Sequence, residues 1–531
     1  MATHSISYKK TGYFSKLICD YLDENPSLSS FYNRFPKLEN FRAQFEEKRS
    51  QLSLAQRRKL AKRIMFQYGD NNLSQSTLSN IDLLYEPDTF TVTTGHQLNL
   101  FTGPLYFLYK IFSTINLTEA LNKEYPKHYF VPIYWMATED HDFDEINYFN
   151  LFGSKIQWNR DAAGAVGELS TEGLNTVKEI LKKKLGPGKN ADKLVSYFAQ
   201  AYQENTNLAD ATRHLANLMF WEYGLVIVDG NDAELKKEFI PYAEKELTEN
   251  LSFKMVSETT EKLTALGYPE QVHPREINLF YLTENLRERI IEKEGRFYVN
   301  ESDISFSKEE ILEELHEKPE RFSPNALLRP LYQEVILPNL CYIGGGGELA
   351  YWFQLKDYFK KVEVPFPVLL LRNSALLVTK TLSEKLKKLN TGIEELFLPQ
   401  HELITRHTYN ISKIDIDFSK QKEFLKQQFK DLYTLAEKTD ASFLGAVGAQ
   451  EKKQLNGLDN LEKRLLKAQK RKFSEELDRL KNIQNQLFPK QSLQERQLNF
   501  SEFYLEHEEE LLELLKENLE PLDFNFTVLE L

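Results

Sequence analysis

The chain has 531 residues, of which 41% are hydrophobic and 27% charged, and its formal net charge is −12. This length predicts two or three domains, and the acidic balance argues against a general nucleic-acid-binding protein, which would need a basic surface. No apolar run is long enough to span a bilayer, and the N-terminal stretch lacks a hydrophobic signal core. We therefore expect a cytoplasmic protein with no membrane and no nucleic-acid partner, in which Cys19 and Cys341 are small buried hydrophobes.

The N-terminal segment, residues 1 to about 80, is predicted to be helical because its apolar residues recur on one helical face. An α/β core follows it. The stretch from Thr91 to Pro104 is typical of a buried strand, a tight polar turn and the start of a helix, since Gly95 and Gly103 relax the backbone and Pro104 fits a first helical turn. Free N–H groups and the helix dipole make such a turn a ready anion or nucleotide site.

A second strand is predicted over Tyr129–Met136, and the acidic segment Ala137–Glu145 follows it directly. The order strand, helix, strand predicts a right-handed crossover and a parallel sheet. Both polar segments would then lie at the carboxyl ends of neighbouring strands, where open α/β sheets bind their ligands.

Two insertions, near residues 152–220 and 235–325, are predicted to interrupt the core. The first would hold a hairpin within Gly153–Glu168 and helices over Leu174–Phe220, broken by Gly186-Pro-Gly188. Further core elements are expected at Leu225–Gly230, Leu340–Ile343 and Pro367–Arg372 (strands), at Gly344–Glu348 (a turn) and at Leu349–Lys361 (a helix).

From Leu376 onward the composition shifts to Lys, Glu, Gln and Leu with apolar residues at three- and four-residue steps. Two such segments joined through Ala441–Gly457 predict an antiparallel helical hairpin or coiled coil, which could pair protomers or be satisfied within one chain. The predicted domains are residues 1–375 for the core, 376–500 for the helical coiled coil, and 501–531 for a helix (Glu502–Leu519) and a short strand (Phe524–Leu529) that return to the core.

His96 and Gln97 occupy the first polar turn. One interpretation is that they contact phosphates or stabilise charge during attack on a phosphoryl or acyl centre. The alternative is a histidine that caps the turn and packs structurally.

The end of the second strand is crowded with charge: His141 is flanked by Glu139, Asp140, Asp142, Asp144 and Glu145. Carboxylates this close repel one another and need a cation, a cationic substrate or solvent. They could bind Mg²⁺ together with nucleotide phosphates, or recognise a substrate amino group with a carboxylate or His141 as proton acceptor. A solvated acidic turn that caps a helix is the structural alternative.

Three further segments carry candidate groups. The turn Gly344–Glu348 could be the floor of a ligand site or a tight strand-to-helix turn, and it is neither a P-loop nor a dinucleotide fingerprint. Arg372, with Asn373 and Ser374, could bind a carboxylate or phosphate. Gln494–Arg496 could lock domains together or touch a nucleotide.

These motifs occur in a fixed order: Thr94-Gly-His-Gln97 with Phe101-Thr-Gly-Pro104, Glu139-Asp-His-Asp-Phe-Asp-Glu-Ile146, Gly344–Glu348 with Tyr351-Trp352, Leu371-Arg-Asn-Ser374, and Leu487-Phe-Pro with Leu493-Gln-Glu-Arg496. Together they resemble the bacillithiol biosynthesis cysteine-adding enzyme family over nearly the whole chain, with a loose match from about 150 to 330. The resemblance implies a Rossmann-like parallel-sheet core with two connecting insertions, an α-helical antiparallel coiled-coil domain that supports a homodimer, and ligation of L-cysteine to glucosaminyl malate.

The implied core is similar to class I aminoacyl-tRNA synthetases and nucleotidyltransferases, but Gly95-His-Gln97 lacks the second histidine of their usual motif. Because an amide does not form readily from a free acid in water, we expect ATP to activate the carboxylate, as an acyl-adenylate or an acyl-phosphate, with or without Mg²⁺. Two alternatives stay open: a synthetase-like or nucleotidyltransferase-like enzyme for another small amine or acid, and a non-catalytic dimeric assembly protein.

The resulting site prediction has three parts and assigns no metal ligands. The catalytic residues are His96, Gln97, Asp140, His141 and Asp142. Substrate binding is assigned to Thr94, Gly95, Asn99, Gly103, Glu139, Asp144, Gly345, Gly346, Glu348, Tyr351, Arg372, Asn373 and Ser374. A second site for ATP or ADP, near the helical domain, is assigned to Gln494, Arg496 and Tyr504.

Overall fold

The computed structural model describes residues 3–69 and 72–531, which divide into two compact units. The larger unit comprises Thr3–Ala375 and Glu495–Val528, and the smaller contains Leu376–Gln494 and Leu529–Leu531. Within the described residues, no helix is both long and apolar enough to cross a membrane.

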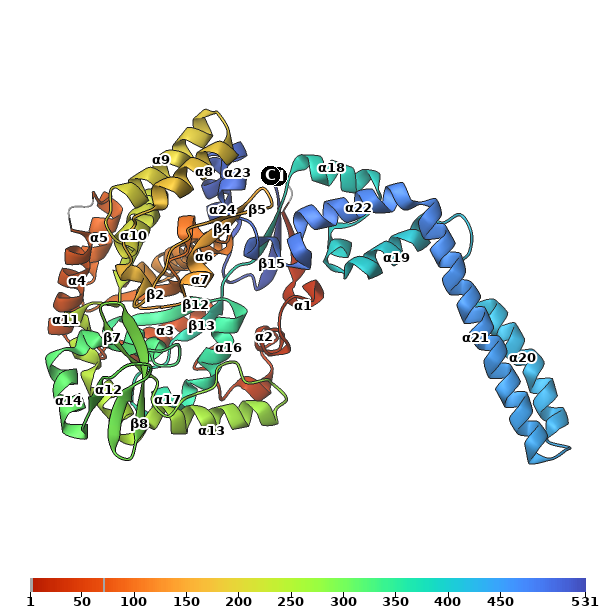
Figure 1. Cartoon of the computed structure of the whole chain (residues 1–531), viewed down its shortest axis with the longest axis horizontal. Coiled ribbons are helices and arrows are strands. Elements are labelled where there is room, and N and C mark those ends of the chain that lie inside the picture. Colours follow the sequence, from red (N-terminus) through yellow and green to blue (C-terminus); the bar gives the residue numbers. More distant parts are fainter. Residues whose placement is uncertain (1–2, 70–71) are drawn as a thin grey trace. The chain divides into compact units, whose positions relative to one another are not determined.

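The core of the larger unit is a parallel sheet with the strand order β13-β12-β2-β3-β6 (Figure 1). Its strands are rich in β-branched and aromatic residues and are buried on both faces, as expected for a parallel sheet covered by helices. Side chains of β2, β3, β12 and β13 pack with helices α3 and α6 into one apolar cluster. The strands are β2 (Thr89–His96), β3 (Tyr129–Met136), β6 (Val226–Asp229), β12 (Asn339–Gly344) and β13 (Val368–Leu371).

The direction of chain travel across this sheet reverses between β2 and β12. From β2 the chain moves outward through helix α6 (Tyr106–Glu124) to β3 and then β6, and it later returns on the other side of β2 as β12 and β13. Thr94 pairs with Ile343 in this register, so the turns that start at Gly95 and Gly344 leave the sheet side by side. Such a switch point opens a crevice at the carboxyl ends of the strands.

The first insertion contains a hairpin and a helical stretch broken at Gly186–Gly188, as predicted, but the hairpin lies earlier than expected and a second break, between Gln203 and Leu208, gives three helices. Its strands are β4 (Tyr148–Leu151) and β5 (Ser154–Gln157), so the predicted hairpin within Gly153–Glu168 is wrong beyond Gln157. Gly153, with φ of 71°, lies in the turn between the two strands. The helices are α8 (Leu174–Leu185), α9 (Lys189–Gln203) and α10 (Leu208–Met219), and α7 (Phe143–Ile146) precedes the hairpin.

The second insertion builds an antiparallel sheet of its own, with the order β10-β9-β8-β7-β11 (Figure 1). No strands were predicted for this segment from the sequence. Its strands are β7 (Leu279–Thr283), β8 (Leu286–Lys293), β9 (Arg296–Val299), β10 (Ser305–Phe306) and β11 (Phe322–Pro324). Its helices are α11 (Ala233–Lys236), α12 (Ile240–Glu249), α13 (Leu251–Ala265) and α14 (Lys308–Glu317).

The remaining elements of the larger unit differ from prediction at three points. The described residues of the N-terminal segment form helices joined by turns, with one strand, β1 (Thr3–Ser7). The predicted helix Leu349–Lys361 is divided at Leu355, and the predicted helix Glu502–Leu519 breaks at Glu508, where φ is 52°. These elements are α1 (Tyr8–Thr11), α2 (Lys16–Leu22), α3 (Leu38–Lys48), α4 (Leu54–Tyr68), α5 (Gln75–Leu83), α15 (Arg329–Ile336), α16 (Gly346–Gln354), α17 (Lys356–Lys361), α23 (Ser501–His507) and α24 (Glu510–Asn518).

The smaller unit is helical, and its helices α20 (Ser419–Ala436) and α21 (Ala441–Lys472) run side by side as an antiparallel hairpin (Figure 1). Phe429, Ala436 and Val447 form the small apolar core of the hairpin. The prediction that Ala441–Gly457 joins the two arms is wrong: α21 begins at Ala441, where the Asp440 side chain accepts a hydrogen bond from Phe443 N. An N-cap starts the helix there, and glycine costs only about 1 kcal/mol inside it.

The other helices of the smaller unit are α18 (Lys380–Lys388), α19 (Gln400–Ile411) and α22 (Ser474–Leu487). Among the described residues the chain passes between the units within β14 (Ala375–Val378), between Gln494 and Glu495, and within β15 (Asn525–Glu530).

Candidate functional site

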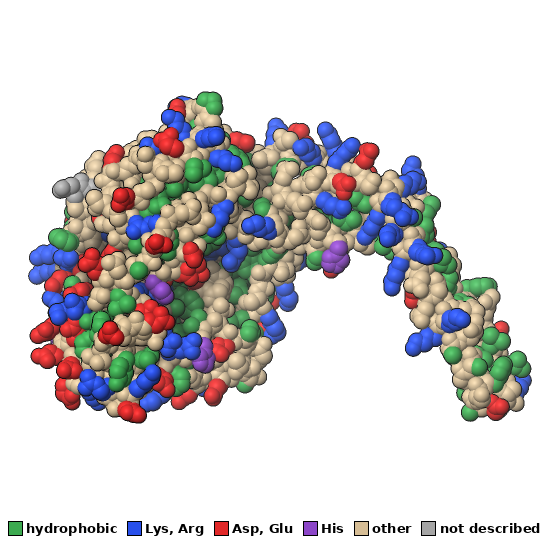
Figure 2. Space-filling view, in the orientation of Figure 1, with side chains coloured by type: hydrophobic (Ala, Val, Ile, Leu, Met, Phe, Trp, Pro, Cys, Tyr) green, Lys and Arg blue, Asp and Glu red, His purple; other side chains and the backbone are tan. Residues whose placement is uncertain are grey.

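A cavity of about 690 Å³ lies in the larger unit at the carboxyl ends of β2, β3 and β12. Figure 2 shows a hollow on this unit, bordered by acidic, basic and histidine side chains. The second insertion supplies the wall that faces the strand ends. Of the residues predicted from the sequence, those that line the cavity are Gly95, His96, Gln97, Glu139, Asp140, His141, Gly345, Glu348, Tyr351, Arg372 and Arg496.

The switch point is held together by an ion pair between Lys110 and Glu348. Lys110 Nζ lies 2.6 Å from Glu348 Oε2 and donates to Gly95 O at 2.6 Å, so it binds both turns. Glu348 also accepts from Tyr342 Oη at 2.7 Å and from Gly345 N at 2.8 Å. Burial opposes ionisation of Glu348, but the Lys110 ammonium and these hydrogen bonds lower its pKa to about 2.

Lys110 was not predicted from the sequence, although a signal exists. It is the only charged residue of α6 before Glu119, in a helix that is otherwise apolar over that stretch. A charged residue that is buried in such a helix needs a partner, and that requirement points to a site.

His96 is buried beneath the cavity, packed against the rings of Tyr106 and Phe107. Burial, reinforced by the nearby Lys110 ammonium, lowers the pKa of His96 to about 3, so the imidazole is neutral at physiological pH. Its Nε2 is buried and has no hydrogen-bond partner among the residues that the structure describes. A neutral imidazole has one donor and one acceptor nitrogen and adds no cation to the site.

Gln97 bridges two carboxylates at the end of β3. Its Nε2 donates to Asp140 Oδ2 and to Glu145 Oε2, both at 2.9 Å. Asp140 also accepts from His141 N at 2.8 Å. The amide therefore ties the first polar turn to the acidic one and relieves the repulsion between the carboxylates.

The cavity wall carries arginines that were not predicted from the sequence, three of them from the second insertion and Arg329 from α15. Arg275, Arg287, Arg289 and Arg329 line the cavity, and none of them lies within 4.0 Å of a carboxylate oxygen in the described part of the chain. Arg287 and Arg289 are two residues apart on β8, so both side chains lie on the same face of the hairpin. That spacing is readable in the sequence once the segment is known to be a strand.

Arg287 is itself held in place from several directions. It donates to Ser323 Oγ at 3.1 Å and to His141 Nδ1 at 2.5 Å, and its guanidinium lies 4.1 Å from the centre of the Phe280 ring. Since arginine can only donate, His141 accepts through Nδ1 and carries its own proton on Nε2. His141 therefore offers the cavity a hydrogen-bond donor.

Arg372 lines the cavity but already has an acidic partner. Its Nη2 lies 2.7 Å from Glu495 Oε1, and its Nη1 donates to Asn373 O and Ser374 Oγ. Its Nε is buried without a partner among the described residues. Glu495, Asn373 and Ser374 thus orient the guanidinium, leaving one donor for a ligand.

The other predicted site residues do not line the cavity. Thr94 donates to Ile343 O and joins β2 to β12, and Gly103, with φ of 64°, packs against Asn99. Gln494 pairs with the backbone of Leu377. Those outside the cavity lining are Thr94, Asn99, Gly103, Asp142, Asp144, Gly346, Asn373, Ser374, Gln494 and Tyr504.

The described residues contain no group of three or more His, Cys, Asp or Glu side chains arranged to hold a metal ion. Glu139 pairs with Lys236 and Glu348 with Lys110. The net character of the cavity wall is therefore cationic rather than acidic, in contrast to the sequence, where the acidic cluster is the more conspicuous feature.

Comparisons with known proteins agree along the entire chain. Residues 1–373 match the family described as Bacillithiol biosynthesis BshC, N-terminal Rossmann-like domain, and residues 375–531 match the Bacillithiol biosynthesis BshC, C-terminal coiled-coil domain. A protein of Christiangramia forsetii named as cysteine ligase BshC is 59% identical, with 100% of this chain and 99% of the relative covered. Proteins of the same name from Flavobacterium johnsoniae (56%; 100% of each chain) and Bacillus cereus (31%; 80% of this chain and 81% of the relative) are also similar.

Proposed function

The chain belongs to the BshC family of bacillithiol biosynthesis, and on that premise we propose that it is a ligase that joins L-cysteine to glucosaminyl malate. The observation that carries the proposal is the surplus of arginine around the cavity. Arg287 is buried, Arg289 and Arg329 are half-buried, and Arg275 is exposed at the cavity. Guanidinium groups that are buried or half-buried without an acidic partner are costly, and they fit anionic ligands. Glucosaminyl malate brings two carboxylates, and the second-insertion wall with Arg275, Arg287 and Arg289 would receive them.

The opposite wall would act on the carboxylate of cysteine. That carboxylate needs activation, and ATP would supply it as a cosubstrate. His96 Nε2 and Arg372 Nε are buried donor or acceptor atoms without partners in the described chain, and both residues line the cavity. They would bind a phosphate or the developing oxyanion, and Mg²⁺ would arrive bound to the phosphates, since Glu139 and Glu348 of the wall already pair with lysines.

The acidic end of β3 would handle the amino groups. Glu139 and Asp140 line the cavity as carboxylates, while His141 presents a donor. A carboxylate is therefore the better candidate to orient the ammonium of cysteine or to accept a proton from the sugar amine.

The test is to incubate the purified protein with L-cysteine, glucosaminyl malate and Mg-ATP and to follow products by mass spectrometry. We expect bacillithiol together with AMP or ADP, and the nucleotide product distinguishes adenylation from phosphorylation. If folded protein forms no bacillithiol but ligates other small amines or acids when they are supplied, the result would favour a synthetase-like enzyme of different specificity. The absence of any turnover or ligand-induced stabilisation would favour a non-catalytic assembly protein.

His96→Ala tests the catalytic turn within the same assay. We expect product formation to be lost with the fold intact, because the variant removes a neutral hydrogen-bonding group and leaves the surrounding strand in place. The matched control is His316→Ala, which removes a histidine that is 58% exposed and does not line the cavity. Wild-type turnover in the His96 variant would exclude a catalytic role for it.

We also propose that the helical hairpin pairs two protomers. Phe424, Leu435 and Leu461 are 69%, 54% and 52% exposed on α20 and α21. Figure 2 shows apolar side chains along this hairpin. A coiled-coil seam of this kind is satisfied by a second copy of the same helices.

A further inference from the structure

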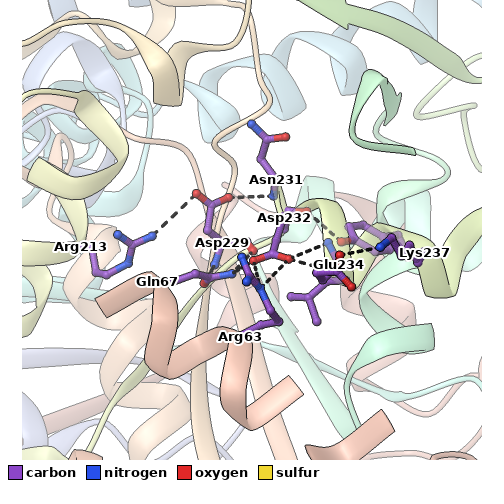
Figure 3. Close-up of polar contacts among 11 residues, drawn as sticks. Arg63, Gln67, Arg213, Asp229, Asn231, Asp232, Glu234 and Lys237 are labelled. Carbon is purple, nitrogen blue, oxygen red and sulfur yellow. Dashed lines mark hydrogen bonds and ion pairs between the residues drawn. The ribbon is translucent and has the colours of Figure 1, made fainter. Parts of the chain in front are cut away.

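The turn between β6 and α11, residues Asp229–Lys236, lies next to the cavity wall and takes no part in the proposed chemistry. Figure 3 shows that helix α4 fixes this turn through Arg63 and Gln67. Arg63 Nε donates to both carboxylate oxygens of Asp232, at 3.1 and 2.9 Å. Gln67 donates to Asp229 O at 3.0 Å and accepts from Asp229 N at 2.9 Å.

The first end of the turn holds the backbone next to Glu139. Asp229 Oδ1 accepts a hydrogen bond from Thr138 Oγ1 and another from Asn231 N at 2.8 Å. Thr138 O in turn accepts from Gly167 N at 2.8 Å. An added Cβ on Gly167 would lie 2.7 Å from Thr138 Cβ, so the first insertion packs directly on this residue. Thr138 is thereby fixed from two sides.

The second end of the turn holds the Glu139 side chain. Asp232 Oδ1 accepts from Glu234 N and Leu235 N and so starts α11, which carries Lys236. Lys236 is 2% exposed, and its ammonium donates to Glu139 Oε1, to Glu320 O at 3.1 Å and to Phe322 O at 3.2 Å. A lysine ammonium has three donors, so Lys236 has none left for a ligand.

Lys236 therefore joins the first helix of the second insertion to the end of β3 and to the closing segment of the same insertion. Phe322 begins β11, and the cavity-lining residues Pro324, Asn325 and Ala326 follow it. The Oε2 atom of Glu139 accepts no hydrogen bond within the described chain, and Glu139 lines the cavity.

We propose that the Asp229–Lys236 turn is a positioning device that presents Glu139 to the cavity, with one carboxylate oxygen held by Lys236 and the other free to bind the amino group of a substrate. This inference rests on the proposed ligase function. Thr138 sets the backbone of Glu139, and Lys236 sets its side chain. Lys236 is a positioning residue, since it reaches the substrate only through Glu139.

The test compares Lys236→Met, Glu139→Gln and the double variant by steady-state kinetics with each substrate varied in turn. We expect both single variants to lower kcat/KM at least about tenfold, through KM of the same amino-bearing substrate. The double variant should lose no more kcat/KM than the more impaired of the two single variants, because the two residues act as one unit. The matched control is Lys237→Met, since Lys237 pairs only with Glu234 at the surface.

A second variant guards against misfolding. Thr138→Val removes the hydrogen bond to Asp229 at nearly constant volume, and we expect the same KM to rise with Lys236 untouched. The positioning role would be overturned by either of two results. One is a loss of kcat/KM in the double variant equal to the product of the two single losses, and the other is wild-type kinetics in Lys236→Met.

Direct binding separates this inference from the proposed function. If calorimetry shows that the wild type binds L-cysteine or glucosaminyl malate and the variants bind it at least about tenfold more weakly, the positioning role stands even without product formation. If the wild type binds neither compound, both proposals fail.

Discussion

Glu348→Gln should remove a defined part of the acid sensitivity of the larger unit. The pKa of Glu348 is lowered from 4.5 to about 2 in the folded protein. This difference corresponds to about 3 kcal/mol of unfolding free energy at neutral pH, because one pKa unit is worth about 1.4 kcal/mol. The contribution is fully present above pH 4.5 and disappears as pH falls toward 2, since a depressed carboxyl pKa stabilises only the ionised state.

About 2 kcal/mol of that contribution should be lost between pH 7 and pH 3. Urea unfolding of wild type and Glu348→Gln at both pH values measures it, and all four tryptophans, which lie in the larger unit, report the transition. We expect the variant to be less stable than the wild type at pH 7. The difference in unfolding free energy between the two proteins should be smaller by about 2 kcal/mol at pH 3. Glu179→Gln is the control, since its side chain is 62% exposed beside Lys178. An unchanged difference would refute the ion-pair reasoning.

Three further changes test separate features. Arg287→Met should raise KM for the dicarboxylate substrate roughly 10- to 100-fold, the size of one lost charge-assisted hydrogen bond, and unchanged kinetics would remove Arg287 from substrate binding. Gly103→Ala should lower the unfolding free energy by at least about 1 kcal/mol in urea titrations, because φ is 64° and the new Cβ would lie 2.5 Å from Asn99 Cβ; wild-type stability would contradict that strain. Replacing Phe424 and Leu435 by Glu should give a monomeric mass in light scattering, and a persistent dimer would place the interface elsewhere.

The parallel core was predictable because its strands carry their own signal. Tyr129–Met136 and Val368–Leu371 are apolar runs with β-branched or aromatic residues, and such runs form strands wherever both faces are covered. Helix ends were less predictable. Glycines within Ala441–Gly457 suggested a loop, but the Asp440 cap and packing along the hairpin outweigh their modest helix penalty.

The candidate site was predicted only on the side formed by the strand ends. His96, Glu139 and Glu348 follow apolar strands at Gly-rich or acidic turns, which marks them in the sequence. Arg287 and Arg329 lie in segments without such a mark, and their distance from the strand ends along the chain gives no hint that they face the same cavity.

The sequence by itself determined the strand–turn–helix units of the core, the two insertions, the helical hairpin and the family, because these depend on local periodicity, turn chemistry and motif order. Only the tertiary structure decided the charge of the cavity. Folding pairs Glu139 with Lys236 and Glu348 with Lys110, so the carboxylates that dominate the sequence are largely neutralised. The unpaired arginines of the second insertion then set the sign of the site, since charge pairing depends on distances in space that no local pattern encodes.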